Sequence, residues 1–199
     1  MSEGFLSIAK QRRTIYALGK ELPVSQDKVI EIIKEAVRQA PSAFNSQSSR
    51  VLILLGSGHN TFWQLAREQL RKIVPAENFQ STSDKLDGFA AAAGSVLFFE
   101  DQEVVKNLQE QFAAYADNFP VWSEHSTGIA QYAVWLALAE QGIGANLQHY
   151  NPLVDADVQR TWNIPASWKL RAHMNFGSIT APAGEKSYIE DDKRFIIAG

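Results

Sequence analysis

The chain has 199 residues, of which 45% are hydrophobic and 21% charged, and its net charge is −3, so we expect one soluble domain over residues 1–199. This charge gives no general attraction to nucleic acid or to an anionic membrane, and no apolar run approaches the roughly 20 residues that cross a bilayer. The absence of cysteine excludes disulfides, cysteine nucleophiles and thiolate metal sites, and it fits a cytoplasmic protein.

Apolar spacing predicts a series of helices and one short strand in the first half of the chain. In chain order these are helices at 3–18 and 26–39, a strand at 51–55, and helices at 60–73 and 85–93. Ser25 is a suitable N-cap for the second helix, and Pro41 stops it. A polar loop, PSAFNSQSSR, then spans residues 41–50, and Gly56-Ser57-Gly58 is typical of a turn.

The second half continues the alternation of helices and strands. The predicted elements are a strand at 95–99, helices at 102–118 and 123–141, a short helix from 155 or 157 to 162, and a strand at 168–178. Residues 123–141 are apolar nearly all round, which predicts a buried central helix with Gly142 as its C-cap. The last strand alternates, so Leu170, Ala172, Met174 and Phe176 are expected on one face. The whole pattern predicts an α+β fold, with one small sheet covered by helices.

The candidate functional residues are polar rather than catalytic. Ser42, Asn45 and Gln47 donate and accept hydrogen bonds without charge, which suits the edge of a flat heteroaromatic ligand, although a plain helix-to-strand loop has the same composition. The four histidines have no helical metal-site spacing, and there is no Gly-x-Ser-x-Gly elbow. We therefore expect no metal site and no side chain that acts as the catalyst, as in enzymes whose cofactor carries the chemistry.

Four segments, in this order, resemble the FMN-dependent nitroreductase family. They are Arg12-Arg13-Thr14, the Pro-Ser-x-x-Asn-x-Gln stretch that begins at Pro41, Gly142-Ile-Gly144-Ala145 and Lys193-Arg194. The short length, KLDGF at 85–89 and the SVLFFED strand are similar to the small nitroreductases of fungi and lactic-acid bacteria. The resemblance implies a nitroreductase-like fold with a small mixed or antiparallel sheet, forming an intertwined homodimer with FMN at the subunit interface. It also implies NADH or NADPH as the electron donor.

The resemblance assigns a phosphate clamp to both ends of the chain. Arg12 and Thr14 match the family positions that hold the FMN phosphate, with Arg13 beside them. Arg194 matches the basic residue near the C-terminus that completes the clamp, and Lys193 is its neighbour. Guanidinium groups suit phosphate because they bind it through two parallel hydrogen bonds.

The resemblance also assigns residues to the flavin itself. Ser42 is implied near the flavin or its ribityl–phosphate side, and Asn45 and Gln47 on the ribityl chain or the pyrimidine edge. The segment whose backbone is implied to face flavin N5 and O4 is Gln148, His149 and Tyr150. Trp122 and His125 lie just before the long helix and are candidates for the substrate pocket, although packing at a helix start would explain both.

The chain departs from the family pattern at two places in these motifs. The family often has a lysine where this chain has Tyr16, and a positive charge there stabilises the anionic reduced flavin. Its absence predicts a weaker oxidant unless another cation, for which Lys85 is a candidate, takes its place. Ser48-Ser49 stands where the family has Pro-Trp.

Three functions follow from these observations. The first is hydride transfer from NAD(P)H through flavin N5 to a nitroaromatic, quinone or related small-molecule acceptor, by a ping-pong mechanism. The second is an FMN-binding storage or regulatory protein with little turnover. The third is an interaction protein whose polar loops are only loops. None of the three requires nucleic acid or a membrane as partner.

Overall fold

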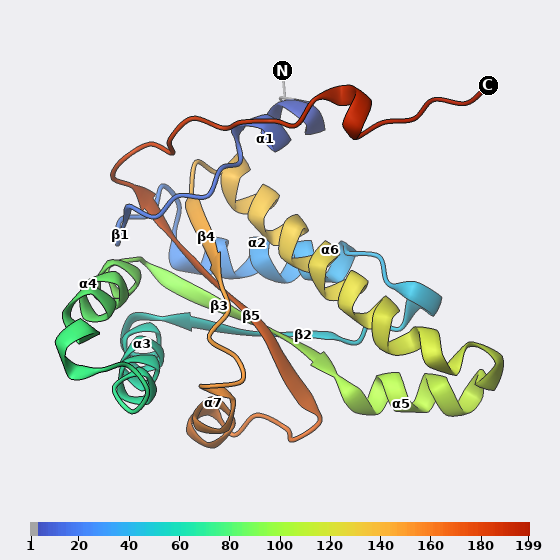
Figure 1. Cartoon of the computed structure of the whole chain (residues 1–199), viewed down its shortest axis with the longest axis horizontal. Helices are drawn as coiled ribbons and strands as arrows, with labels where there is room; N and C mark the ends of the chain where they lie inside the picture. Colours follow the sequence, from blue (N-terminus) through green and yellow to red (C-terminus); the bar gives the residue numbers. More distant parts are fainter. Residues whose placement is uncertain (1–3) are drawn as a thin grey trace.

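The computed structural model describes residues 4–199 as a central antiparallel sheet with helices on both faces (Figure 1). The helices are α1 Phe5–Gln11, α2 Gln26–Gln39, α3 Gly56–Leu70, α4 Phe79–Ala90, α5 Gln102–Gln111, α6 Phe119–Glu140 and α7 Asp155–Trp162. The strands are β1 Leu18–Gly19, β2 Ser49–Leu55, β3 Gly94–Asp101, β4 Gly144–Gln148 and β5 Trp168–Ile179. Short 3₁₀ turns cover η1 Ala43–Asn45, η2 Ala76–Asn78, η3 Ala113–Asn118 and η4 Asp191–Lys193. The predicted α+β class is confirmed.

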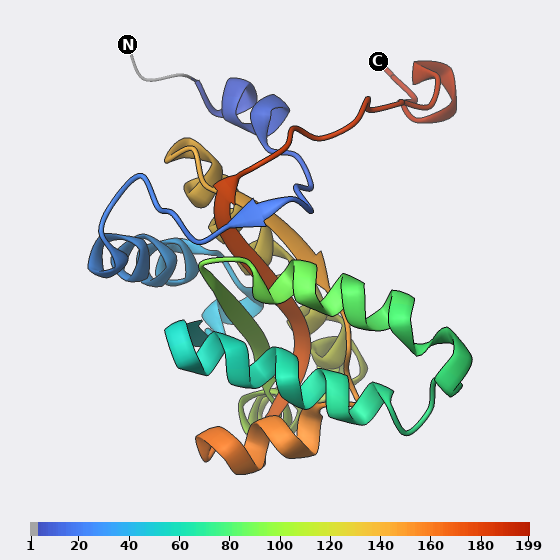
Figure 2. The same ribbon diagram turned by 90° about the vertical axis from the view of Figure 1, so that its left-hand side faces the viewer.

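The sheet has the order β1-β5-β3-β2, and β4 also pairs with β5. Every residue of β3 is buried. Helices α2 and α6 cover one face, where Val29, Ile33, Val134 and Leu138 pack on the strands. Helices α3, α4 and α7 cover the other face (Figure 2), where the core is built around Phe62, Trp63, Leu86, Phe89 and Val158. The sheet is therefore buried on both sides, which explains its apolar strands.

Several local predictions are confirmed. Ser25 caps α2, since its hydroxyl accepts from the Lys28 N–H at 3.3 Å. Gly142 lies just past the end of α6 with φ at +73°, a left-handed conformation that glycine adopts without a Cβ clash. Helix α7 ends at Trp162, as predicted.

The predicted helix over 3–18 is wrong beyond Gln11. Residue 3, its first, lies outside the described residues. At Arg12 the backbone leaves the helical region (ψ 114°), and Ile15 N donates to Ala145 O at 2.9 Å. Ile15 and Leu18 are buried against the sheet, whereas α1 itself has no buried residue. Pairing with β4 and burial of these two side chains outweigh the helical spacing.

The predicted helix over 102–118 is also shorter. Helix α5 ends at Gln111, where Phe112 (φ −126°, ψ 63°) breaks the helical backbone and packs its ring 4.9 Å from that of Phe44. Helix α6 begins earlier than predicted, at Phe119, because Pro120 is tolerated in a first turn, where its missing N–H is not needed. Gly56-Ser57-Gly58 is not a separate turn but the start of α3, with Gly56 at φ +52°.

The faces of β5 differ from the predicted alternation. Phe98 pairs with Ala172 but Phe99 pairs with Leu170, so Arg171 is an extra residue in a β-bulge. The bulge moves Leu170 to the α3 side of the sheet, while Ala172 and the later apolar residues of β5 face α6. An alternating sequence does not reveal this change, because a bulge shifts the two-residue period by one.

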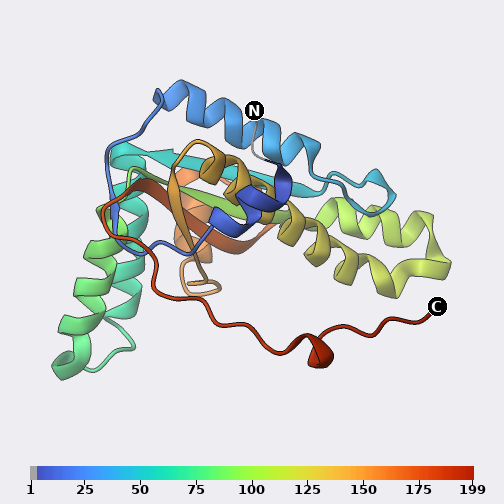
Figure 3. The ribbon, with the colours of Figure 1, turned by 90° about the horizontal axis from the view of Figure 1, so that it is seen from above.

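The C-terminal tail leaves the sheet after β5 and runs along the outside of the molecule (Figure 3). Phe195, Ile196 and Ile197 are 58%, 96% and 97% exposed, so the body of this chain does not cover them. Their packing on a partner subunit stays a prediction. Within residues 4–199, no helix is both long and apolar enough to cross a membrane.

Candidate functional site

An open cavity of about 450 Å³ lies between the segment after α1 and the start of the tail. Its lining residues are Arg12, Arg13, Thr14, Tyr16, Ala17, Pro182, Ala183, Gly184, Glu185 and Lys186. Arg13 donates from Nη2 to Gly184 O at 2.6 Å, which ties the tail to this segment. The structure thus brings all four predicted N-terminal residues to one cavity, together with the unpredicted Lys186.

The Arg12 side chain lies against Trp135, between two cavities. Its guanidinium carbon lies 4.5 Å from the ring centre of Trp135 on α6, a cation–π arrangement. Arg12 Nε and Trp135 Nε1 are both buried and have no hydrogen-bond partner among the described residues. The two side chains also border a second cavity of about 170 Å³. Buried donors normally have partners, so this pair fits a ligand that carries acceptor oxygens.

Asn146 holds the Arg12–Tyr16 segment in place from within the sheet. It is fully buried on β4, and its Nδ2 donates to Ile15 O at 2.8 Å. Its Oδ1 accepts from Gln148 Nε2 and from Asn175 Nδ2, each at 3.0 Å. The position of the basic segment therefore depends on one buried amide.

The network continues through the sheet to α3. Asn175 Oδ1 accepts from Ser95 Oγ at 2.9 Å and from Trp63 Nε1 at 3.0 Å, and Ser95 Oγ lies 2.8 Å from His59 Nδ1. Ser95, Asn175 and Asn146 are register partners on three adjacent strands. Sequence reasoning missed this row, because Asn175 is one of several polar residues in β5 and its partners lie on other strands.

We expect the two buried histidines to make stability depend on pH. Burial lowers the pKa of His59 and of His173 to about 4, against about 6.5 in an unfolded chain. Between these values the unfolded chain binds protons that the folded chain does not. The contribution of the neutral histidines to the free energy of unfolding is therefore fully present above about pH 6.5 and is lost as pH falls toward 4. The loss between pH 7.5 and 5 is about 2 kcal/mol per histidine. Urea unfolding at both pH values measures it.

His125 is exposed and provides the control for this pH dependence. His125→Gln should keep the pH dependence of the wild type, whereas His59→Gln should reduce it. Equal free energies of unfolding at pH 7.5 and 5 would contradict the prediction.

The loop between α2 and β2 has a strained backbone. Phe44, Asn45 and Gln47 have φ of 56°, 50° and 47°, a region that costs free energy for residues other than glycine. Ser42 Oγ accepts from Gln47 N at 2.9 Å, and the guanidinium of Arg50 donates to Gln47 O. Such strain collects at functional sites, where surrounding contacts hold an unfavourable conformation.

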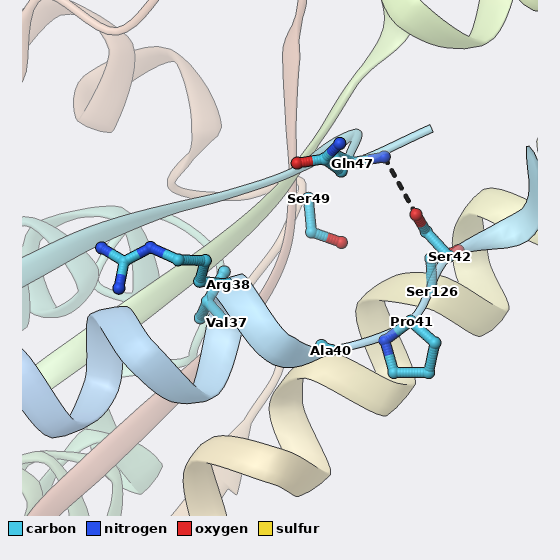
Figure 4. Close-up of a pocket in the computed structure, with 8 residues that line it drawn as sticks. All are labelled: Val37, Arg38, Ala40, Pro41, Ser42, Gln47, Ser49 and Ser126. Atoms are coloured by element: carbon cyan, nitrogen blue, oxygen red, sulfur yellow. Dashed lines mark hydrogen bonds between the residues drawn. The ribbon is translucent and has the colours of Figure 1, made fainter. Parts of the chain in front are cut away.

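Two cavities border this loop. Figure 4 shows the first, of about 140 Å³, which is lined by Val37, Arg38, Ala40, Pro41, Ser42, Gln47, Ser49 and Ser126. The second, of about 260 Å³, is lined by Pro41, Ser42, Ala43, Trp122, His125, Ser126 and Ile129. The structure thus places Trp122 and His125 beside Ser42. Asn45 is exposed and lines neither cavity.

Aromatic side chains from the η3–α6 region pack against Phe44 of this loop. Phe44 stacks on Trp122, with ring centres 5.8 Å apart and planes 18° apart. Its ring also contacts Phe112, Tyr115 and Phe119. Phe44 therefore joins the loop to the η3–α6 region.

The predicted residues at the end of β4 and just after it lie in different surroundings. Gln148 belongs to the buried network, His149 is exposed, and the Tyr150 ring packs against Trp63 and Phe89 in the core under α3 and α4. Burial raises the pKa of Tyr150. The Tyr150 side chain therefore serves the core, which leaves only its backbone for the predicted role.

The C-terminal basic pair lies away from these cavities. Lys193 and Arg194 are exposed in and just after η4, and Arg194 lies 6.0 Å from the ring centre of Phe195. Neither lines a cavity described above, and neither does Lys85, whose Nζ lies over the Phe89 ring on α4. In this part of the tail, Lys186 is the basic residue that reaches the Arg12 cavity.

Within one chain, the Arg12 cavity and the loop cavities lie at different positions along α6. Arg12 contacts Trp135, whereas the loop contacts Trp122 and Ser126. Nine to thirteen residues of helix separate these contacts, which is about 14–20 Å along its axis. One chain therefore presents two partial sites.

Comparison with known proteins agrees with this geometry. The family model described as "Nitroreductase family" matches residues 9–178. The nitroreductase FRM2 of Saccharomyces cerevisiae is 35% identical over 189 residues, which is 94% of each chain. The nitroreductase CinD of Lactococcus lactis, solved with chloramphenicol and also with 4-nitrophenol, is 56% identical. In the chloramphenicol complex the match covers 98% of this chain and 100% of that one, with a TM-score of 0.91.

A more distant structure shares the fold. It is a nitroreductase from Desulfitobacterium hafniense with bound FMN, 16% identical, with a TM-score of 0.71 over the whole of both chains. The family match covers most of the sequence, and the two closer relatives cover nearly all of it. The chain belongs to the nitroreductase family.

Proposed function

We propose that this chain is an FMN-dependent oxidoreductase that reduces small electron acceptors with NADH or NADPH. The observation that carries the proposal is the Arg12 cavity, where two arginines, a threonine hydroxyl and Lys186 surround a space and Arg12 Nε has no partner within residues 4–199. A phosphate supplies the oxygens that such donors require. The FMN bound by a family member of the same fold supports this choice of ligand.

The remaining predicted residues fit the other parts of the cofactor. Ser42 and Gln47 line a polar cavity suited to hydroxyls or to the edge of a heteroaromatic ring. When bound, FMN supplies the redox chemistry, by taking a hydride at N5 and passing it to the acceptor in a ping-pong sequence. The protein binds and orients the reactants, and no side chain of this chain is assigned as an acid or base.

A homodimer is the proposed working form. The two partial sites lie apart within one chain, so a second copy is needed to bring a loop cavity to an Arg12 cavity. Helix α6 exposes Val121, Ile129 and Tyr132, and the tail exposes Ile196 and Ile197. Apolar surface of this kind is typical of an interface between subunits.

Nitroaromatic compounds are the proposed acceptors. Trp122 and His125 line the cavity beside Ser42, and the aromatic ring of Trp122 suits a flat substrate. The complexes of CinD with chloramphenicol and 4-nitrophenol support this class.

Tyr16 also lines the Arg12 cavity, at the position where the family often has a lysine. Lys186 lines the same cavity and is the proposed source of the positive charge that this lysine would supply.

The test is the visible spectrum of the purified protein, before and after NADH or NADPH is added without oxygen. We expect flavin bands that bleach, and then recover when a nitroaromatic compound is added. A colourless protein that FMN does not reconstitute would contradict the proposal. Flavin bands that persist with both donors would instead indicate a storage or regulatory protein.

We expect Arg12→Ala to weaken FMN binding by about 1.5–3 kcal/mol, roughly 10- to 150-fold, because a charge-assisted contact to phosphate is lost. Arg194→Ala should have a similar effect if the tail of a partner completes the clamp, and Lys186→Ala if the clamp is closed within one chain. Lys106→Ala, on the exposed face of α5, is the control and should bind FMN normally. Unchanged affinity in Arg12→Ala would remove this residue from the clamp.

A further inference from the structure

Glu100 is a buried carboxylate that hydrogen-bonds the two serines that follow the loop of the proposed FMN site. It is fully buried near the end of β3. Its Oε2 accepts from Ser48 Oγ and its Oε1 from Ser49 Oγ, each at 2.5 Å. An ionised carboxylate only accepts hydrogen bonds, so both serine hydroxyls must point their hydrogens toward Glu100.

Asp101, the next residue, holds the same loop at other points. Its backbone N–H donates to Ser48 O at 3.0 Å. Its carboxylate accepts from Arg50 Nη2 at 3.1 Å, and Arg50 in turn donates to Gln47 O. The two acids thus attach the end of β3 to the strained backbone between Phe44 and Gln47, which explains how the loop keeps its unfavourable conformation.

The direction of these hydrogen bonds determines what the cavity in Figure 4 offers a ligand. Ser49 lines the cavity, and its hydrogen is committed to Glu100, so its oxygen faces the ligand only as an acceptor. The Ser126 oxygen also faces the ligand only as an acceptor, because its hydroxyl donates to Trp122 O at 2.9 Å. Two acceptors on one cavity suit a ligand with donors, such as the hydroxyls of a polyol chain or an imide N–H.

We propose that Glu100 is a positioning residue for cofactor binding: it fixes the loop and makes Ser49 a hydrogen-bond acceptor toward the ligand. The inference rests on the proposed function, because the ligand taken to supply those donors is FMN. Glu100 itself does not line the cavity and acts through the two serines.

The charges around Glu100 come from three other elements. They are Arg50 on β2, Glu124 on α6, and Lys169 and Arg171 on β5. Burial is the main reason that the pKa of Glu100 is raised, and Glu124 adds to it, while the two serine bonds and Arg50 oppose it. Arg171 pairs with Glu124 at 2.8 Å, and Arg50 is the cation that lowers the pKa of Glu100. The charged state should therefore be lost at a higher pH than for an exposed glutamate.

The test compares Glu100→Gln with Glu110→Gln, the same change at an exposed position of α5. A glutamine accepts from one serine and donates to the other, so one of the two hydroxyls loses its acceptor and the loop loses a charge-assisted hydrogen bond. We expect FMN affinity, measured by flavin fluorescence on the apoprotein, to fall at least 10-fold in Glu100→Gln and not in Glu110→Gln. The affinity should fall more steeply in the wild type than in Glu100→Gln as pH decreases, because the variant keeps the titration of the FMN phosphate but lacks that of Glu100.

Two further measurements separate this inference from the proposed function. Ser49→Ala should weaken binding on its own but add little to Glu100→Gln, because both changes act on one acceptor; fully additive effects would overturn the inference. Amide exchange of Gln47 and Asp101 in the apoprotein reports the loop without any ligand, and both amides should lose protection in Glu100→Gln. If the wild type binds no FMN, the proposed function fails. Unchanged protection in Glu100→Gln, with or without FMN binding, overturns the role of Glu100.

Discussion

Replacing Asn146 with alanine is expected to destabilise the protein by about 4 kcal/mol, because it leaves buried polar groups without partners. Ile15 O loses its donor, and Asn175 Nδ2 loses its acceptor, and both groups lie in a sheet that is covered on both sides. Each unpaired buried group costs about 1–3 kcal/mol, and the small cavity left by the side chain adds to this. Urea unfolding with an unchanged m-value measures the loss.

The same substitution should also weaken FMN binding. Asn146 fixes Ile15, and Ile15 lies between the predicted clamp residues Thr14 and Tyr16. Asn60→Ala is the matched control, since Asn60 is an exposed asparagine on α3, and it should change stability by less than about 0.5 kcal/mol. A loss below about 1 kcal/mol in Asn146→Ala would show that water or backbone movement replaces the network.

Gly177→Ala is expected to cost about 3 kcal/mol or more, because no space exists for a Cβ on this part of β5. A Cβ at this position would lie 2.1 Å from Gly19 O and 3.0 Å from Ala93 N. Both neighbours are backbone atoms, so no rotamer change relieves the contact. The pairing of β1 with β5 must open instead, and with it the chain that leads from the Arg12 segment into α2.

Gly88→Ala provides the control for this prediction. Gly88 lies on the exposed face of α4, where a Cβ meets no atom within 4 Å. Alanine favours a helix over glycine, so this variant should be about 0.5–1 kcal/mol more stable than the wild type. Urea unfolding of both variants measures the contrast, and equal stabilities would contradict the close approach at Gly177.

Much of the fold could be predicted from local signals. The apolar stripe of α2 and its Ser25 cap, the all-round apolar character of α6, and the short apolar strands depend on neighbours in sequence. The family motifs likewise lie within short stretches. The N-terminal motif residues do line one cavity together, and Ser42 does lie beside Trp122 and His125.

The errors occurred where distant contacts override local preference. The segment after Gln11 has helical spacing, but its pairing with β4 makes it extended. Phe112 ends α5 because its ring packs on Phe44, which is far away in the sequence. The bulge at Arg171 shifts the faces of β5 through its pairing with β3. Each of these depends on residues that are brought together only by the tertiary fold.

The sequence by itself determined the α+β class, most helices and the family, because these depend on periodicity, caps and short motifs. Only the tertiary structure showed the row from Asn146 to His59, the serines held by Glu100, and Lys186 beside Arg12. Their partners are separated by 29 to 174 positions, and a contact across such a distance has no local signature. The chemistry of each residue can be read from the chain, but its partner is decided by the register of the sheet and the path of the tail.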